Sequence, residues 1–88
     1  MTSEKFTEKA KQLVSDYTVE HLDKTDTVPP FDVFVVWSCF ILGNQKALLS
    51  TTNSDGMYYE VTYNGDKNEW YLDAYKKFEN RCIPGGDV

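Results

Sequence analysis

The sequence feature that most constrains the fold is an apolar run, FDVFVVWSCFIL, from Phe31 to Leu42. It is rich in β-branched and aromatic residues, which favour strands, and it is too short to span a bilayer. Read as a strand, it is apolar on both faces, with Asp32 and Ser38 as its only polar interruptions. Because a strand of this kind belongs inside a covered sheet, we expect it to be an interior strand with Trp37 facing the core.

An amphipathic helix is expected before this run, from Ser3 to about Lys24, with Ser3 as its N-cap. Apolar residues recur every three or four positions, which is the spacing of one helix face: Phe6, Ala10, Leu13, Val14, Tyr17 and His21 or Leu22. The segment TDTVPP, residues 25–30, then breaks the helix, because its two prolines cannot continue it and favour an extended entry into the next strand.

Three further strands are expected after the apolar run, and clusters of Gly, Asn, Asp and Ser separate them. The expected strands are Lys46–Thr52, Met57–Asn64 and Glu69–Tyr75, with turns at 43–45, 53–56 and 65–68. A four-residue loop at 65–68 pairs Tyr63 with Trp70 and Val61 with Leu72, which sets apolar against apolar on one face. Residues 76–83 fit either a short terminal helix or a continued strand.

The predicted fold class is therefore α+β: an N-terminal helix packed on an antiparallel β-meander of three to four strands, with a short C-terminal helix as an open alternative. Helix residues such as Phe6 and Leu13 are expected to cover the face that bears Trp37 and Trp70. The length of 88 residues predicts a single domain over residues 1–84 and a flexible C-terminal tail over residues 85–88.

The charge balance, 14 acidic against 9 basic residues, argues against non-specific binding of nucleic acid, which needs clustered Lys and Arg. Solubility is the simplest reading, and mimicry of nucleic acid or a basic protein partner are the alternatives. The N-terminus, MTSEKFTEKAK, lacks the apolar stretch of a signal peptide. We therefore expect a cytoplasmic protein without membrane association, in which both cysteines are reduced and Cys39 is buried; a disulfide with Cys82 would require an oxidising compartment.

Few residues are suited to catalysis. His21 is the only histidine, and one histidine with two distant cysteines does not give the ligand spacing of a metal site. We expect no catalytic residue, no metal and no cofactor, and hence no enzyme. Asp66, Glu69 and Asp73 gather around the last hairpin, where carboxylates could serve acid–base or Mg²⁺ chemistry. We favour a charged edge that blocks strand addition.

The tyrosines of the last two strands are the better indication of function. Tyr58, Tyr71 and Tyr75 are predicted to project from the face opposite the core, where they could stack on bases or anchor a protein partner. Because only Lys76, Lys77 and Arg81 cluster nearby, we favour a protein partner; packing of the tyrosines under the C-terminal segment is the alternative. The residues that we predict to bind the partner are Tyr58, Tyr71, Tyr75, Asp66, Glu69 and Asp73.

The run DGMYYEVTYNGDKNEWYLDAYKKFENRCI, from Asp55 to Ile83, resembles an uncharacterised family of small proteins encoded by bacteriophages of Gram-positive bacteria. The helix EKFTEKAKQLVSDY and the VVW of the apolar run fit the same family, so the resemblance covers nearly the whole chain. It implies a phage or prophage origin, expression in the cytoplasm of the bacterial host and an accessory role, but it carries no activity and no functional residues.

Small acidic phage proteins of this class often bind host factors. We therefore expect a non-catalytic phage accessory protein that binds a host or phage protein, such as an inhibitor of a host defence nuclease, including a CRISPR effector. The partner would then be a nucleic-acid-binding enzyme. The alternatives are a nucleic-acid-binding module of phage replication or regulation, and a subunit that forms a homodimer along an exposed strand.

Overall fold

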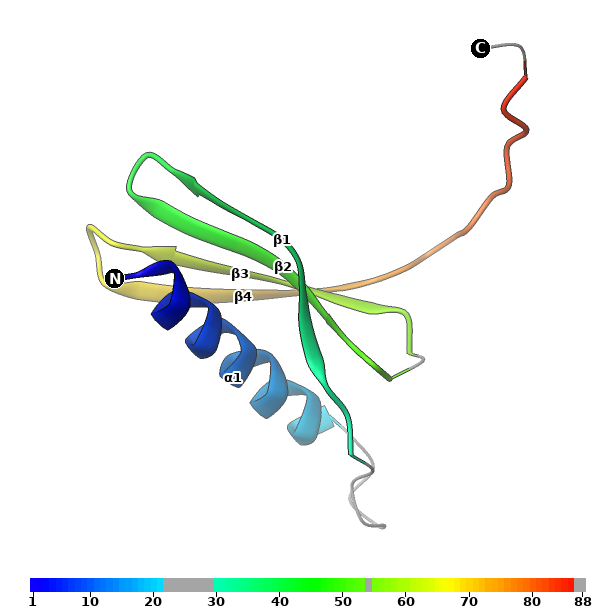
Figure 1. Ribbon diagram of the computed structural model, residues 1–88. Coiled ribbons are helices and arrows are strands. Elements are labelled where there is room, and N and C mark those ends of the chain that lie inside the picture. The colour runs from blue at the N-terminus through cyan, green and yellow to red at the C-terminus, as the bar shows by residue number, and fades with distance from the viewer. Residues whose placement is uncertain (22–29, 54, 87–88) are drawn as a thin grey trace.

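The computed structural model describes residues 1–21, 30–53 and 55–86. Within these ranges the chain forms one helix and four strands: α1 (Ser3–His21), β1 (Val33–Ile41), β2 (Asn44–Thr51), β3 (Met57–Asn64) and β4 (Glu69–Lys76). The strands form one antiparallel sheet in the order β1-β2-β3-β4, and α1 lies across one face of it (Figure 1). The predicted α+β class is thus confirmed. The expected helix end near Lys24 and residues 25–29 of the connector lie outside the described residues.

Helix α1 buries one stripe against the sheet, made by Phe6, Ala10, Val14 and Thr18, at intervals of four residues. Its N-cap is Thr2, whose hydroxyl oxygen accepts a hydrogen bond from the Lys5 amide at 3.2 Å. The predicted cap at Ser3 is wrong by one residue, because Ser3 already belongs to the first helical turn and the hydroxyl before it reaches the free amide.

The core lies between α1 and the two central strands, where Ala47, Leu49, Tyr59 and Val61 are buried. Trp70 of β4 closes one end of the core, with its ring stacked 5.6 Å from that of Phe6. The predicted register of the last hairpin is confirmed, because Tyr63 lies opposite Trp70 and Val61 lies opposite Leu72.

Strand β1 is an edge strand, so the predicted interior position is wrong. A meander leaves its first and last strands with one neighbour each, and β1 pairs only with β2 within the described part of the chain. The register shifts between Val35, which lies opposite Leu49, and Trp37, which lies opposite Leu48. The unpaired Val36 is a β-bulge.

This bulge moves Trp37 to the face away from α1, because one extra residue reverses the alternation of side chains. Val35 still packs against the core, whereas Trp37 shares its face with Leu48. The prediction that α1 covers Trp70 is confirmed, and the prediction that it covers Trp37 is wrong.

The β1–β2 turn consists of Leu42 and Gly43, one residue earlier than predicted, since β2 already begins at Asn44. Both residues have positive φ, 49° for Leu42 and 81° for Gly43, as a two-residue turn with primed geometry requires.

Strand β4 ends at Lys76. Residues 77–86, which we call the C-terminal arm, form neither the short helix nor the continued strand that the sequence allows for residues 76–83. The amide of Lys77 still donates to the carbonyl of Gly56 at 2.8 Å, and the arm then leaves the sheet (Figure 1). Phe78 and Ile83 are 99% and 81% exposed on it. The radius of gyration, 15.6 Å, accordingly exceeds the value of about 12 Å expected for a compact chain of this length.

Candidate protein-binding surface

The face of the sheet opposite α1 is covered by no part of the chain that the structure describes, and we call it the open face. The strand registers assign residues from all four strands to it. These are Phe34, Trp37, Cys39, Ile41, Asn44, Lys46, Leu48, Ser50, Tyr58, Glu60, Thr62, Asn64, Glu69, Tyr71, Asp73 and Tyr75.

Aromatic side chains dominate the two outer strands of the open face. Phe34 and Trp37 on β1 are 45% and 44% exposed, and Tyr71 and Tyr75 on β4 are 46% and 52% exposed. Tyr75 lies directly opposite Tyr58 on β3. Each exposed ring therefore rests on its neighbours in the sheet and leaves about half of its surface for a partner.

Charged residues occupy the middle of the open face. Lys46 and Glu60 form an ion pair across β2 and β3, with 3.2 Å between Nζ and Oε1. Asp73 lies directly opposite Glu60, and two like charges in that position repel each other. The centre of the face therefore has an excess of negative charge that a cationic group of a partner would relieve.

The structure brings most of the predicted binding residues together. Tyr58, Tyr71, Tyr75 and Asp73 share the open face, as the registers show. Glu69 accepts a hydrogen bond from the Tyr71 hydroxyl, and this bond raises the pKa of that phenol above its usual value of 10.0. Asp66 lies apart, in the β3–β4 turn, where its amide donates to the Asn64 side-chain oxygen at 3.1 Å.

Sequence reasoning missed the contribution of β1 to this surface. The sequence predicts an interior strand that is covered on both faces, with Trp37 in the core, and so predicts no exposed ring on this strand. The tip of the β1–β2 hairpin was also missed, although Phe40, Ile41 and Leu42 are 68%, 56% and 92% exposed. One sequence signal indicates this exposure, namely that the strand is apolar on both faces. In a two-layer fold, α1 can cover only one face of an edge strand, so the apolar residues of the other face must be exposed.

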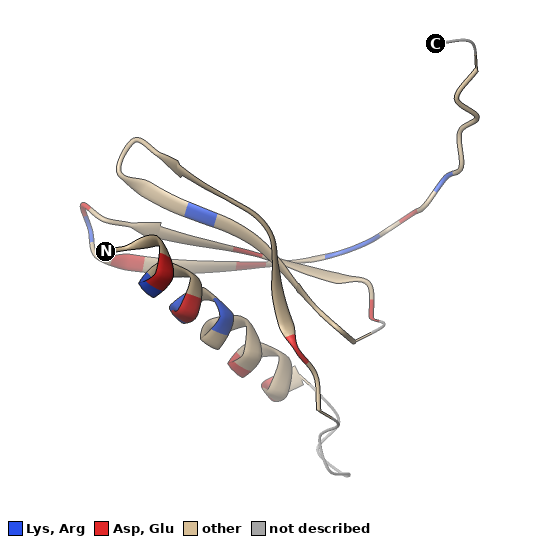
Figure 2. Cartoon of the chain, in the orientation of Figure 1, with Lys and Arg blue, Asp and Glu red and all other residues tan. Residues whose placement is uncertain are grey.

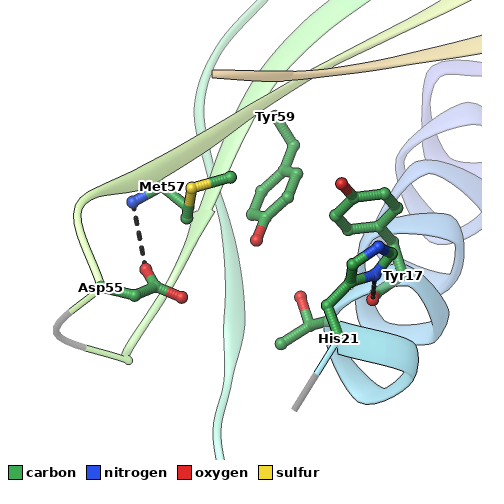
Figure 3. A pocket seen from close by; sticks show the side chains of 6 residues that line it. Tyr17, His21, Asp55, Met57 and Tyr59 are labelled. Carbon is green, nitrogen blue, oxygen red and sulfur yellow. Dashed lines mark hydrogen bonds between the residues drawn. The ribbon is translucent and has the colours of Figure 1, made fainter. Parts of the chain in front are cut away.

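A cavity of about 220 Å³ lies between the last turn of α1 and the start of β3 (Figure 3). It is lined by Tyr17, Thr18, His21, Asp55, Met57 and Tyr59. The His21 ring stacks on Tyr17 with 4.0 Å between centroids, and its Nδ1 lies 2.9 Å from the Tyr17 carbonyl oxygen. Since a carbonyl only accepts, Nδ1 carries a proton.

The remaining groups of this cavity are also engaged. Asp55 accepts a hydrogen bond from the Met57 amide at 3.0 Å. Burial raises the pKa of Tyr59 above its usual value of 10.0, and nearby Asp55 raises it further, while a hydrogen bond with Thr18 lowers it. The described lining thus offers one imidazole, one carboxylate and the hydroxyls of Thr18, Tyr17 and Tyr59.

Cys39 is half-buried on the open face, so its predicted burial is wrong, and Cys82 is exposed on the C-terminal arm. Both thiols are free. Among the described residues, no group of three or more His, Cys, Asp or Glu side chains is placed to hold a metal ion. No helix within residues 1–21, 30–53 and 55–86 is long and apolar enough to cross a membrane.

Comparison with known proteins yields a family and no activity. No curated protein and no solved structure matches the chain significantly. A family model described as a family of unknown function matches residues 7–85, which include most of the helix, all four strands and most of the C-terminal arm. The chain therefore belongs to the family of unknown function DUF6275.

Proposed function

We propose that this protein is a non-catalytic binding module that docks another protein on its open face. The observation that carries the proposal is the set of half-exposed aromatic side chains on that face, Phe34, Trp37, Tyr71 and Tyr75. Aromatic residues supply most of the binding energy in protein interfaces, because they bury a large area at a low cost in conformational entropy.

The area left on these rings is large enough to matter. Burying the exposed half of one aromatic side chain removes about 100 Å² from water, which is worth roughly 2.5 kcal/mol. Burial of four such rings supplies about 10 kcal/mol, which is comparable to the free-energy cost of the translational and rotational freedom that two proteins lose when they associate. Affinity therefore needs additional contacts, which the exposed apolar tip of the β1–β2 hairpin, Phe40 to Leu42, is placed to add.

The charges of the open face favour a partner with basic groups. Glu60 and Asp73 are opposite each other, and Lys46 pairs with only one of them. A lysine or arginine of the partner would sit beside Asp73 and relieve this repulsion. The same charges oppose the alternative of a nucleic-acid-binding module, although Tyr58 and Tyr75 form a row on which bases could stack.

The resemblance to proteins of phages of Gram-positive bacteria supports a finer version of the proposal. In that version the chain is a phage accessory protein that acts in the host cytoplasm on a host protein. A defence nuclease such as a CRISPR effector fits the acidic face, because the nucleic-acid groove of such an enzyme is basic.

Affinity purification with a matched control tests the proposal. Tagged protein is incubated with lysate of a Gram-positive host, and the bound proteins are identified by mass spectrometry. The open-face variant W37S/Y75S is compared with K9S/E20S, which changes two exposed residues of α1. Circular dichroism verifies that both variants are folded.

We expect a stoichiometric partner that binds the wild type and K9S/E20S and is lost from W37S/Y75S. A partner that W37S/Y75S retains would refute docking on the open face. If the partner dissociates steeply as salt rises, mimicry of nucleic acid is supported; retention at high salt would leave apolar docking and exclude mimicry. A gel shift of DNA or RNA at low salt would favour the nucleic-acid module instead.

A further inference from the structure

We infer that the C-terminal arm of one copy adds as a fifth strand to the edge of β1 in a second copy, so that two chains exchange arms in a homodimer. This inference concerns a strand edge and not the open face, and it goes beyond the proposed function. Its two elements are the outer edge of β1, which has no partner strand in the described ranges of the chain, and residues 77–86, which leave their own sheet after Lys77.

The acceptor edge of β1 lies beside a groove that α1 forms with the start of this strand. The groove holds about 430 Å³ and is lined by Glu8, Lys11, Gln12 and Ser15 of α1 and by Phe31, Asp32 and Val33. A strand edge next to a helix is an arrangement that receives extended peptides by β-strand addition, because the edge supplies backbone hydrogen bonds and the groove receives alternate side chains.

The length of the arm matches that of β1. Ten extended residues, 77–86, span about 33 Å, and the nine residues of β1 span about 30 Å. In an extended arm, Phe78 and Cys82 point to one side while Arg81 and Ile83 point to the other. The arm therefore offers apolar surface both to the face that bears Trp37 and to the groove under α1.

Charge complementarity favours the same contact. Acidic residues outnumber basic ones by twelve to six in residues 1–75, whereas residues 76–86 contain three basic residues and one acidic residue. Figure 2 shows the basic positions along the first part of the arm, with one acidic position between them. The acceptor groove is lined by two acidic residues, Glu8 and Asp32, and one basic residue, Lys11, so its net charge is negative and would attract Lys77 and Arg81.

The arm of a chain is poorly placed to reach its own β1. The strands β1 and β4 are opposite edges of the sheet, three strand spacings or about 14 Å apart. Crossing that distance would use about four or five of the ten arm residues and would leave too few to follow β1. Figure 1 shows the arm heading away from β1 and not across the sheet.

Exchange between two copies closes on itself, because each chain supplies one arm and one edge. Pro84, which lacks an amide proton, is tolerated at the end of a new edge strand. The matched family region extends through residue 85 and so includes all but the last residue of the arm.

The two cysteines of the chain provide the test, since Cys39 lies in β1 and Cys82 lies in the arm. Purified full-length protein is treated with a short bismaleimide and analysed by denaturing electrophoresis. We expect a cross-linked dimer for the wild type and none for C39S or C82S alone. Mixing C39S with C82S should restore the cross-linked dimer. In the mixed dimer the C39S chain supplies Cys82 in its arm, and the C82S chain supplies Cys39 in β1.

Light scattering of the untreated protein gives an independent readout. The full chain is expected to have the mass of a dimer, and a chain without residues 77–88 the mass of a monomer. F78S should weaken dimerisation, measured as a higher dissociation constant, whereas the control N80S in the same arm should not. Monomeric wild type, a dimer that survives deletion of the arm, or a cross-link that requires only one kind of cysteine would each overturn the inference.

A cross-link within one chain would show that the arm folds back on its own sheet, which also overturns the exchange. The proposed function is tested separately with Y75S, because Tyr75 lies on β4, at the edge opposite β1, and this change leaves Trp37 and residues 77–86 intact. A dimer that survives deletion of the arm would therefore show that the arm has been assigned wrongly, and a partner that Y75S retains would show that the open face has been assigned wrongly.

Discussion

Replacing Leu42 with asparagine should stabilise the protein by about 1 kcal/mol. Leu42 has φ of 49° in the β1–β2 turn, and its side chain is 92% exposed. A left-handed conformation costs an ordinary L-residue roughly 1–2 kcal/mol, whereas asparagine tolerates it better and is preferred before glycine in this turn. The β3–β4 turn already uses Asn68 at φ of 51°. Because the Leu42 side chain buries almost no apolar surface, L42N loses little hydrophobic stabilisation. The relief of backbone strain therefore determines that the change is stabilising.

The measurement is urea unfolding followed by the fluorescence of Trp37 and Trp70, at one protein concentration because a dimer couples stability to concentration. A gain of about 1 kcal/mol corresponds to a rise in Tm of about 4–8 °C for a domain of this size, with an unchanged m-value. The control is L42A, which removes the exposed side chain but retains the left-handed residue, and we expect it to change stability by less than about 0.5 kcal/mol. Destabilisation by L42N, or an equal gain in L42A, would refute the backbone argument.

Three further predictions concern the core and its polar groups. L49A should lower the free energy of unfolding by about 2–5 kcal/mol in the same urea assay, because Leu49 is fully buried between α1 and the sheet; a loss below about 1 kcal/mol would contradict that packing. Q45M should raise it by about 1 kcal/mol, since the buried Oε1 of Gln45 has no hydrogen-bond partner in the described part of the chain, and a loss of stability would show that this oxygen is satisfied. Burial raises the pKa of Tyr59, so the folded state holds the phenolic proton more tightly than the unfolded chain does. That contribution is complete below pH 10 and is lost as the pH rises through the folded-state pKa, so the wild type should lose stability above pH 10 more steeply than Y59F, and equal slopes in alkaline urea titrations would argue against the shift.

The last hairpin was predictable from the sequence because its signals are local and agree with one another. Alternation along Met57–Asn64 fixes which side chains face the core, and a four-residue loop then determines the pairing of Tyr63 with Trp70. The same alternation placed Tyr58, Tyr71 and Tyr75 on the face opposite the core. The amphipathic spacing of α1 likewise identified the stripe of Phe6, Ala10 and Val14 that the structure buries.

Strand β1 could not be predicted in this way, because it is apolar on both faces and so contains no alternation that would reveal its register. A bulge at Val36 changes the face of Trp37 without changing any local propensity, and the sequence reads equally well with or without it. The order of the strands adds a second constraint: the first strand of a meander is an edge, and α1 covers only one face of the sheet. An apolar strand in that position must expose Phe34 and Trp37. Hence the residues that the sequence could not place, those of β1, form much of the surface that we propose binds a partner. Exposed aromatic side chains lower the solubility of a protein, and a partner that covers them explains why this strand carries them.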